Sequence, residues 1–218
     1  NFARIPEFIS LAENLEKLTE DLRDTTMSIR MVPISETFNS FNRLIYDLSN
    51  SLGKKIKLVT YGGETELDKN VIEALRDPLL HIIRNSCDHG IESPDIRLSK
   101  GKDETGIIEL VAEHSGSNVV IKISDDGAGL DREKILARAI ERGLLQPGEY
   151  DDRVIYSMIF EPGFSTAEIV TDISGRGVGM DVVKKNIEKL RGTISVESRE
   201  NKGTTITLTI PLTLAIID

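Results

Sequence analysis

The sequence predicts an α/β fold with a mixed β-sheet, preceded by one long helix. Segments in which apolar residues recur every three or four positions alternate with short segments in which every second residue is apolar, as expected for helices and strands. Two pairs of predicted strands are joined by the short turns SGSN and ENKG, so each pair is an antiparallel hairpin. Because helices separate the other strands, the sheet combines hairpins with longer connections and is mixed.

A long amphipathic helix is predicted from Phe8 to Ile29. Its apolar and near-apolar positions follow alternating steps of four and three: Leu11, Leu15, Leu18, Leu22, Thr25 and Ile29. Such a seam is typical of helices that pack against another helix, and this one extends for roughly 33 Å at ~1.5 Å per residue. We expect the seam to serve dimerisation; the alternative is packing against a neighbouring domain. Pro33 in MVPI ends the helix, because proline lacks a backbone donor.

The other elements follow in chain order. Residues 35–52 form a second amphipathic helix that ends at Gly53, and its inward positions are Phe38, Phe41, Leu44, Ile45 and Leu48. After the strand KIKLVTY, Asp68 caps a helix that reaches His89 with Pro78 inside it. The first hairpin, IIELVAEH and VVIKIS, is followed by a helix at 131–142, an irregular stretch from Gly143 to Ser174, a helix at 178–190 and the hairpin of TISVESR and TTITLTIP.

Length and composition limit the classes of protein. The 218 residues suit one domain of about 150 residues with a smaller appendage. A net charge of −9 without a cluster of Lys or Arg argues against nucleic acid as a partner, because phosphate neutralisation requires a basic surface. No apolar run reaches the roughly 18–20 residues of a membrane span, and the first residues lack a signal-peptide core. We therefore expect a cytoplasmic protein without direct membrane insertion, and the single Cys87 excludes an internal disulfide.

Polar side chains form a stripe on the helix that follows Pro78. The stripe consists of His81, Asn85, Asp88 and His89, whose spacings of four, three and one place them on one face. Leu79, Ile82, Ile83 and Ser86 are expected to point elsewhere. The amide oxygen of Asn85 suits a hard cation such as Mg²⁺ that bridges phosphates. His81 and His89 can donate to phosphate oxygens or assist proton transfer. Taken alone, such a stripe is more often a solvated face.

The turn DDGAGLD directly follows the predicted strand VVIKIS. Asp125 ends the strand, and Gly127 and Gly129 allow a sharp turn and close approach to a flat ligand. A fixed carboxylate at this point can accept a hydrogen bond from the exocyclic amino group of adenine. An Asp-Gly turn by itself is common and more often has no ligand. Lys134 and Arg138, four residues apart on the next helix, either reach the phosphates of such a ligand or form a solvated basic pair.

The segment GRGVGMD opens a predicted helix. Gly175, Gly177 and Gly179 allow close approach of the backbone, and the free N–H groups and the helix dipole favour a polyphosphate. A dinucleotide-binding fold would place such a run after the first strand of a βαβ unit, with an acidic residue about 20 positions later, which is not the arrangement here. The GxxxxGK[ST] loop and the HRD and DFG motifs are also missing from the sequence, so the common nucleotide-binding folds are excluded.

Four segments together carry a resemblance to a known family. HIIRNSCDHGIE, DDGAGLD, GFST and GRGVGMD resemble, in this order, the N box, first glycine box, F-box region and second glycine box of two-component histidine kinases. The form HxxRNxxDHGIE, with RMVPIS upstream and IPLTLAII downstream, resembles the chemotaxis branch of that family. The resemblance implies the ATP-binding fold shared with gyrase, Hsp90 and MutL, a two-layer sandwich of a mixed sheet and helices. It also implies a partial helical dimerisation domain at 1–33, an ATP-binding catalytic domain at 34–212, and the start of a missing regulatory domain at 213–218.

Carried over by position, the resemblance assigns roles to individual residues. It makes Asn85 the Mg²⁺ ligand, Asp125 the residue that recognises adenine, and His81, Arg84 and His89 neighbours of the phosphates. His81, Asn85 and His89 are the implied catalytic residues. The implied ATP-binding residues are Arg84, Asn85, Asp88, His89, Asp125, Gly127, Gly129, Lys134, Arg138, Ser165, Thr166, Gly175, Arg176, Gly177, Val178, Gly179, Met180 and Thr204. A lid over the phosphates is expected at roughly 143–174.

The implied activity is that of a protein histidine kinase in bacterial chemotaxis two-component signalling, with ATP and Mg²⁺ as cofactors. The γ-phosphoryl group would go to a histidine on a separate phosphoacceptor domain of the same kinase, and none of His81, His89 and His114 is expected to be the acceptor. Implied partners of the full protein are a second copy through the N-terminal helix, a coupling protein, chemoreceptors and response regulators.

Two other classes of function compete with the kinase. An ATP-hydrolysing conformational switch is disfavoured, because His81 stands where such proteins carry a glutamate that activates water. A binding module that has lost its nucleotide is disfavoured, because Asn85 and the glycines are all present.

Overall fold

The computed structural model describes residues 5–164 and 179–212, without the side chains of 5–7, 23–24 and 26–29. The α/β class is confirmed. In chain order the elements are α1 (Ile5–Arg30), β1 (Met31–Pro33), α2 (Ser35–Ser51), β2 (Lys55–Tyr61), β3 (Glu66–Asp68), α3 (Lys69–Asn85), the π-helical turn η2 (Ser86–Gly90), α4 (Pro94–Ser99), β4 (Thr105–Ser115), β5 (Asn118–Asp125), α5 (Arg132–Glu141), α6 (Asp152–Ser157), the 3-10 turn η3 (Met158–Phe160), α7 (Met180–Lys189), β6 (Thr193–Arg199) and β7 (Gly203–Pro211).

The main sheet has five strands in the order β2-β4-β5-β7-β6. β4 and β5 form one antiparallel hairpin and β6 and β7 form the other, as the short turns predict. β2 lies parallel to β4, and the chain between them contains α3, as a parallel connection requires. The predicted mixed sheet is therefore confirmed, with β5 and β7 pairing antiparallel at its centre.

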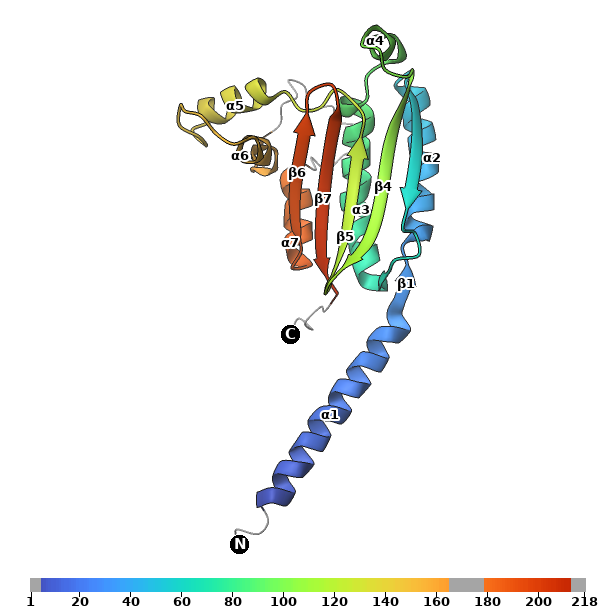
Figure 1. Cartoon of the computed structure of the whole chain (residues 1–218), viewed down its shortest axis with the longest axis vertical. Coiled ribbons are helices and arrows are strands. Elements are labelled where there is room, and N and C mark those ends of the chain that lie inside the picture. Colours follow the sequence, from blue (N-terminus) through green and yellow to red (C-terminus); the bar gives the residue numbers. More distant parts are fainter. Residues whose placement is uncertain (1–4, 165–178, 213–218) are drawn as a thin grey trace.

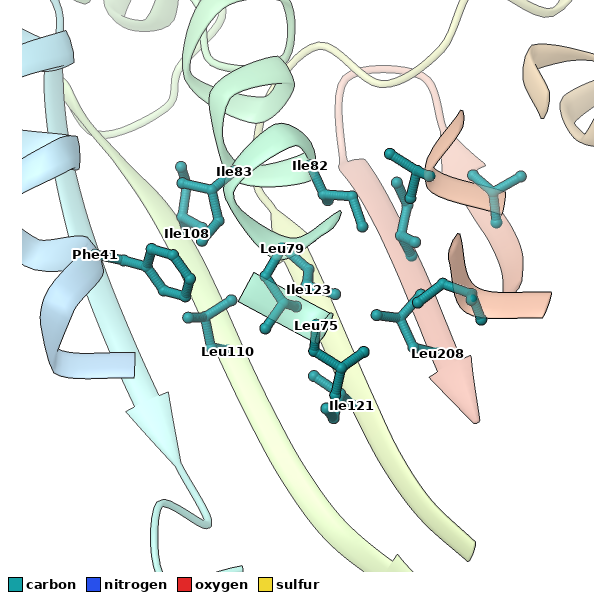
Figure 2. Packing of buried hydrophobic residues seen from close by; sticks show 14 of the residues in the cluster. Phe41, Leu75, Leu79, Ile82, Ile83, Ile108, Leu110, Ile121, Ile123 and Leu208 are labelled. Carbon is teal, nitrogen blue, oxygen red and sulfur yellow. The ribbon is translucent and has the colours of Figure 1, made fainter. Parts of the chain in front are cut away.

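Helices α2, α3 and α7 cover one face of this sheet, so the molecule has the two layers that the resemblance implies (Figure 1). Along β5 every second residue is buried, as in a strand with one covered face. Figure 2 shows the contact between the layers, in which Leu75, Leu79, Ile82 and Ile83 of α3 pack against Ile108, Leu110, Ile121 and Ile123 of the sheet. Burying each such side chain stabilises the fold by about 1.5–3 kcal/mol. This core fixes the position of the α3 C-terminus.

The long helix α1 extends away from the sheet and its covering helices (Figure 1). Leu11, Leu15 and Leu18 on its predicted seam are 64–66% exposed. In α2, by contrast, Phe38, Phe41 and Ile45 are buried as expected, and Leu44 and Leu48 are partly buried. Within the described ranges, no helix is both long and apolar enough to cross a bilayer.

A second, two-stranded sheet joins α1 to the rest of the molecule. β1 pairs antiparallel with β3, so that Met31 lies opposite Asp68. Arg30, the last residue of α1, donates from Nη2 to Asp68 Oδ1 at 3.1 Å. The same oxygen accepts from the N–H of Asn70 at 2.8 Å, which makes Asp68 the predicted N-cap of α3. The short strand Glu66–Asp68 directly before α3 was not predicted from the sequence.

Two other predictions need correction. The stretch from Gly143 to Ser174 is not irregular throughout, since it contains α6, which Asp151 caps through the N–H of Arg153, and η3; residues 165–174 lie outside the described part. The helix α4 was not predicted at all. Both α4 and α6 have six residues, which is less than two turns and too short for a periodic pattern.

Candidate functional site

The polar stripe lies where α3 ends and changes its geometry. α3 ends at Asn85, and the N–H of Ile91 donates to the carbonyl of Ser86 at 2.8 Å, which is the i to i+5 bond of a π-helical turn. The predicted faces assumed α-helical spacing as far as His89. The π turn changes that spacing for Asp88 and His89. The prediction that Ser86 points away from the site was wrong, although its own N–H still bonds to the Ile82 carbonyl with α-helical spacing. Its hydroxyl donates to Asp125 Oδ2 at 3.0 Å.

Asp125 is the last residue of β5 and is only 9% exposed. Its Oδ1 accepts from the N–H of Gly127 at 3.0 Å, and its Oδ2 accepts from Ser86. Burial raises the pKa of Asp125, and the hydrogen bonds from Gly127, Ser86 and the backbone of Thr204 offset that rise only in part. Thr204 lies opposite Asp125 in the β5–β7 pair, as its predicted role in the same site requires. The carboxylate is thus held in one orientation at the end of the central strand β5.

The glycines of the DDGAGLD turn are required by close backbone contacts. A Cβ at Gly127 would lie 2.1 Å from the carbonyl oxygen of Gly90, and the next residue, Ala128, donates its N–H to that oxygen at 2.9 Å. Gly129 has φ +76°, and a Cβ there would lie 2.4 Å from the carbonyl oxygen of Arg199. The turn is therefore packed between the end of η2 and the β6–β7 turn, where only glycine fits.

Asn85 faces the start of α7. Its Nδ2 donates to Met180 Sδ at 3.2 Å, and α3 and α7 pack against each other. This is the only side-chain hydrogen bond of Asn85 to the described residues, so its amide oxygen is available to a ligand. Gly179, the residue before α7, would have a Cβ 2.5 Å from Asp181 Oδ1. The structure thus brings together the predicted residues Asn85, Gly179 and Met180, which are far apart in the sequence.

The basic and imidazole groups of the stripe differ in environment. Arg84 Nε is a buried polar atom without a hydrogen-bond partner in the part of the chain that the structure describes. Burial and the charge of Arg84 lower the pKa of His81, against the opposing charge of Asp181, so His81 is neutral at neutral pH. His89 is exposed, with Nε2 3.5 Å from Asp88 Oδ2.

Several predicted residues are not brought to this site. Lys134 and Arg138 lie on α5, which packs against α6 and η3 and lies beyond β6, away from α3 (Figure 1). Six predicted ATP-binding residues lie outside the described part of the chain: Ser165, Thr166, Gly175, Arg176, Gly177 and Val178. His114 lies near the tip of the β4–β5 hairpin and is exposed.

Two groups beside the site were not predicted. Lys54 donates from Nζ to the carbonyls of Cys87 and Asp88 at 2.8 and 2.6 Å, and so places a cation at the C-terminal end of the helix, where the dipole favours it. Cys87 itself is 0% exposed, and burial raises the pKa of its thiol to about 12. The second group consists of Glu92, Arg97, Lys102 and Asp126, which form ion pairs next to the carboxylate turn. Of this second group, only Asp126 stands in a motif that the sequence marks, as the second aspartate of DDGAGLD.

Comparisons with known proteins identify the family and several relatives. The family described as histidine kinase-, DNA gyrase B-, and HSP90-like ATPase matches residues 74–214. The chemotaxis protein CheA of Klebsiella aerogenes is 50% identical over 212 residues, which are 97% of this chain and 32% of that protein. The sensor histidine kinase CheAY of Helicobacter pylori is 50% identical over 216 residues, which are 98% of this chain and 27% of that protein. The chain thus spans about a third of the length of the relatives it matches.

A solved structure has the same fold at low sequence identity. The catalytic domain of the histidine kinase ThkA superposes with a TM-score of 0.53 at 17% identity, covering 84% of this chain and 94% of that one. At this identity the likeness shows the fold alone.

Proposed function

The chain belongs to the histidine kinase-, DNA gyrase B-, and HSP90-like ATPase family, and from this premise we propose that it is the catalytic core of a chemotaxis protein histidine kinase. In this proposal it binds Mg²⁺-ATP and transfers the γ-phosphoryl group to a histidine on a separate phosphoacceptor domain. The 50% identity to CheA proteins supports the chemotaxis assignment.

The observation that carries the proposal is the fixed carboxylate of Asp125. Ser86 and Gly127 each donate to one of its oxygens, and the glycine turn beside it allows a flat group to approach the backbone. A carboxylate oxygen can accept more than one hydrogen bond, so Asp125 retains acceptor capacity for the exocyclic amino group of adenine. Guanine has a carbonyl at that position, which a carboxylate repels. We therefore assign base recognition to Asp125.

The residues between α3 and α7 fit a polyphosphate with its metal. The available amide oxygen of Asn85 suits Mg²⁺, which needs few protein ligands when it also binds phosphate oxygens. The unpartnered Nε of Arg84 is the kind of buried donor that a phosphate oxygen satisfies. Phosphoryl transfer depends mainly on positioning and on neutralising charge, and these groups supply both. Bound ATP would supply the phosphoryl group itself.

The acceptor is proposed to lie on another domain. His81 is partly buried and has a pKa lowered by burial and by the charge of Arg84, His89 is next to Asp88, and His114 lies near a hairpin tip. A phosphoacceptor histidine must present its nucleophilic nitrogen in line with the γ-phosphate. A histidine that borders the phosphates from the helix of the site cannot do so without leaving that helix face. His81 and His89 are therefore assigned to the phosphate surroundings.

Mixing this chain with a separately produced phosphoacceptor domain and radiolabelled Mg²⁺-ATP tests the proposal. Label should appear on the acceptor domain as acid-labile, base-stable phosphohistidine, and should disappear when the acceptor histidine is replaced. The chain alone should gain no phosphohistidine and hydrolyse ATP only slowly. Rapid release of inorganic phosphate without the acceptor domain would instead indicate a hydrolytic switch. Stoichiometric labelling of His81, His89 or His114 would contradict transfer between domains.

We further propose that α1 pairs with α1 of a second copy in the cytoplasm. Its exposed seam of leucines supports this proposal, because apolar side chains at heptad spacing gain most from burial against another helix. The coupling protein, chemoreceptors and response regulators are proposed as partners of the longer protein, by similarity to the chemotaxis relatives.

A further inference from the structure

A cluster of charged side chains adjoins the turn after β5. Arg97 is 1% exposed; its Nη1 lies 3.2 Å from Glu92 Oε2 and its Nη2 lies 2.8 Å from Asp126 Oδ2. Lys102 Nζ lies 2.9 Å from Glu92 Oε1. Burial alone raises the pKa of Glu92, but the hydrogen bond from Lys102 and the charges of Lys102 and Arg97 outweigh this and lower it. Lys100 Nζ lies 3.6 Å from the same Glu92 oxygen, so the ion pairs join three cations and two anions.

Lys102 and Arg97 converge on one peptide group of the turn. Lys102 Nζ donates to the carbonyl of Asp126 at 2.9 Å and to that of Gly127 at 2.7 Å. Arg97 Nη1 donates to the same Asp126 carbonyl at 3.2 Å. This carbonyl and the N–H of Gly127 belong to one planar peptide unit, so fixing the oxygen also fixes the direction of the N–H. That N–H is the donor to Asp125 Oδ1 at 3.0 Å.

We propose that Lys102, supported by Arg97, is a positioning residue for the nucleotide site. It holds the Asp126–Gly127 peptide so that the carboxylate of Asp125 keeps the orientation that accepts from the adenine amino group. This inference rests on the proposed function, because it deepens the role assigned there to Asp125.

Two other roles make different predictions for the same cluster. A purely structural anchor for residues 91–104 would affect unfolding and leave base selectivity unchanged; buried ion pairs are in general weak evidence for such a role, since apolar replacements are often equally stable. A cation that attracts phosphates at a distance would affect all nucleotides equally. Only a group that acts through Asp125 distinguishes adenine from a purine that lacks the amino group.

Lys102→Met tests the proposal, because it keeps most of the side-chain stem and removes all three donors. Calorimetry with ADP and with purine riboside 5′-diphosphate, which has a hydrogen in place of the amino group, measures the two affinities. The Kd for ADP should rise roughly tenfold, the size of one charged hydrogen bond, and the Kd for the purine analogue by less than about twofold. Equal weakening of both ligands, or none, would overturn the proposal.

Lys122→Met is the matched control, since it removes the same charge from an exposed pair in which Nζ lies 3.0 Å from Glu113 Oε1. It should change neither affinity. Lys102→Gln, which keeps an amide donor on a shorter stem, is the second variant in case Lys102→Met does not fold. Its loss of affinity should again be larger for ADP than for the purine analogue, but smaller than in Lys102→Met. An equal loss of affinity for both ligands would contradict the proposal.

A double-mutant cycle separates this inference from the proposed function. In the background of Asp125→Ala, Lys102→Met should cause no further loss of ADP affinity, because the group through which it acts is gone. Additive losses would show that Lys102 acts on another part of the nucleotide. If the unaltered chain does not bind ADP, the proposed function itself fails. If Asp125→Ala weakens ADP binding and Lys102→Met does not, only the positioning role fails.

Discussion

The buried carboxylate of Asp125 is expected to favour ligand binding and to lower the stability of the free protein. Burial raises the pKa of its carboxyl, so ionising it within the fold is less favourable than in the unfolded chain. A raised pKa in the folded state means that this group favours folding below its ordinary pKa, and that this contribution is lost as the pH rises through the raised value. The ionised carboxylate is therefore a buried charge that costs stability and whose benefit lies in binding.

Replacing this charge should stabilise the free protein. Asp125→Asn keeps an oxygen for the N–H of Gly127 and removes the buried charge, so we expect a higher Tm than that of the unaltered chain at about pH 8, and a difference that vanishes near pH 4. Thermal unfolding across this pH range measures the effect, at about 2–4 °C per kcal/mol for a chain of this size. Asp47→Asn, an exposed site with the same change of charge, should show no such trend. The variant should also lose its preference for ATP over GTP; retained preference would contradict the role of Asp125.

Asn85 is expected to act through the metal. Asn85→Ala removes the available amide oxygen, so it should weaken Mg²⁺-ATP binding roughly tenfold or more, about 1.4 kcal/mol, and abolish phosphotransfer. Binding of ADP without metal should change much less. Calorimetry with and without Mg²⁺ measures both, and Asn42→Ala on the exposed side of α2 is the control. Phosphotransfer at the unaltered rate would refute the assignment.

At the scale of elements, the junction between α1 and α3 depends on one carboxylate. Asp68 Oδ1 accepts both from the N–H of Asn70 and from Arg30, but the two partners differ in exposure, since the Arg30 side chain is 46% exposed. A lost N-cap costs about 1 kcal/mol, whereas an exposed ion pair contributes about 0–1 kcal/mol. The cap should therefore dominate.

Thermal unfolding of two variants measures this difference. Asp68→Ala should lower Tm by about 2–4 °C, corresponding to about 1 kcal/mol. Arg30→Gln should lower it by less than about 2 °C, because it removes only the exposed partner. An equal loss in both variants would mean that the ion pair, and not the cap, is what stabilises the junction.

Elements were predictable from the sequence where they are long enough to show a period. α2 and α3 and both hairpins extend over seven or more residues per element, and their apolar spacing identified them. β1 and β3 have three residues each and exist only because they pair with each other across 35 positions of chain, as Val32 and Leu67 do. The π turn at Ser86 was missed for a different reason: residue types do not signal a change from i+4 to i+5 bonding.

In the candidate site, too, some residues were predictable from the sequence and others were not. Asp125, Asn85 and Met180 were predicted because short motifs mark them, and the structure places them around the end of α3. Arg97 was not predicted, since a charged residue in a segment rich in Lys and Asp is normally solvated. Its burial results from contacts with Glu92 and Asp126, and the second of these is formed only when the chain folds.

At the scale of the whole molecule, the described part of α1 shares no hydrophobic core with the α/β domain, which it contacts through Arg30 and Asp68. The core cluster begins at Ile34, and the described side chains of α1 contribute nothing to it. The exposed seam should therefore determine only the oligomeric state. Leu15→Glu combined with Leu18→Glu should convert a dimer to a monomer, measured by sedimentation, while Tm of the domain changes by less than about 2 °C.

Lys17→Glu is the control for this change, because it alters the net charge equally on the opposite face of α1. It should leave the dimer intact. A monomer at all concentrations in the unaltered chain, or dissociation by Lys17→Glu as well, would argue against the leucine seam as the dimer contact.

The burial of Cys87 makes the protein a convenient subject for site-specific labelling. Alkylating reagents react with the nucleophilic thiolate, which a buried thiol with a pKa of about 12 does not form at neutral pH. The sequence contains no other cysteine. A cysteine introduced on α1 and another on the exposed face of α5 would therefore be the only ones to take up a fluorophore or a spin label. Distances between chosen points could then be followed during nucleotide binding without removing the native cysteine.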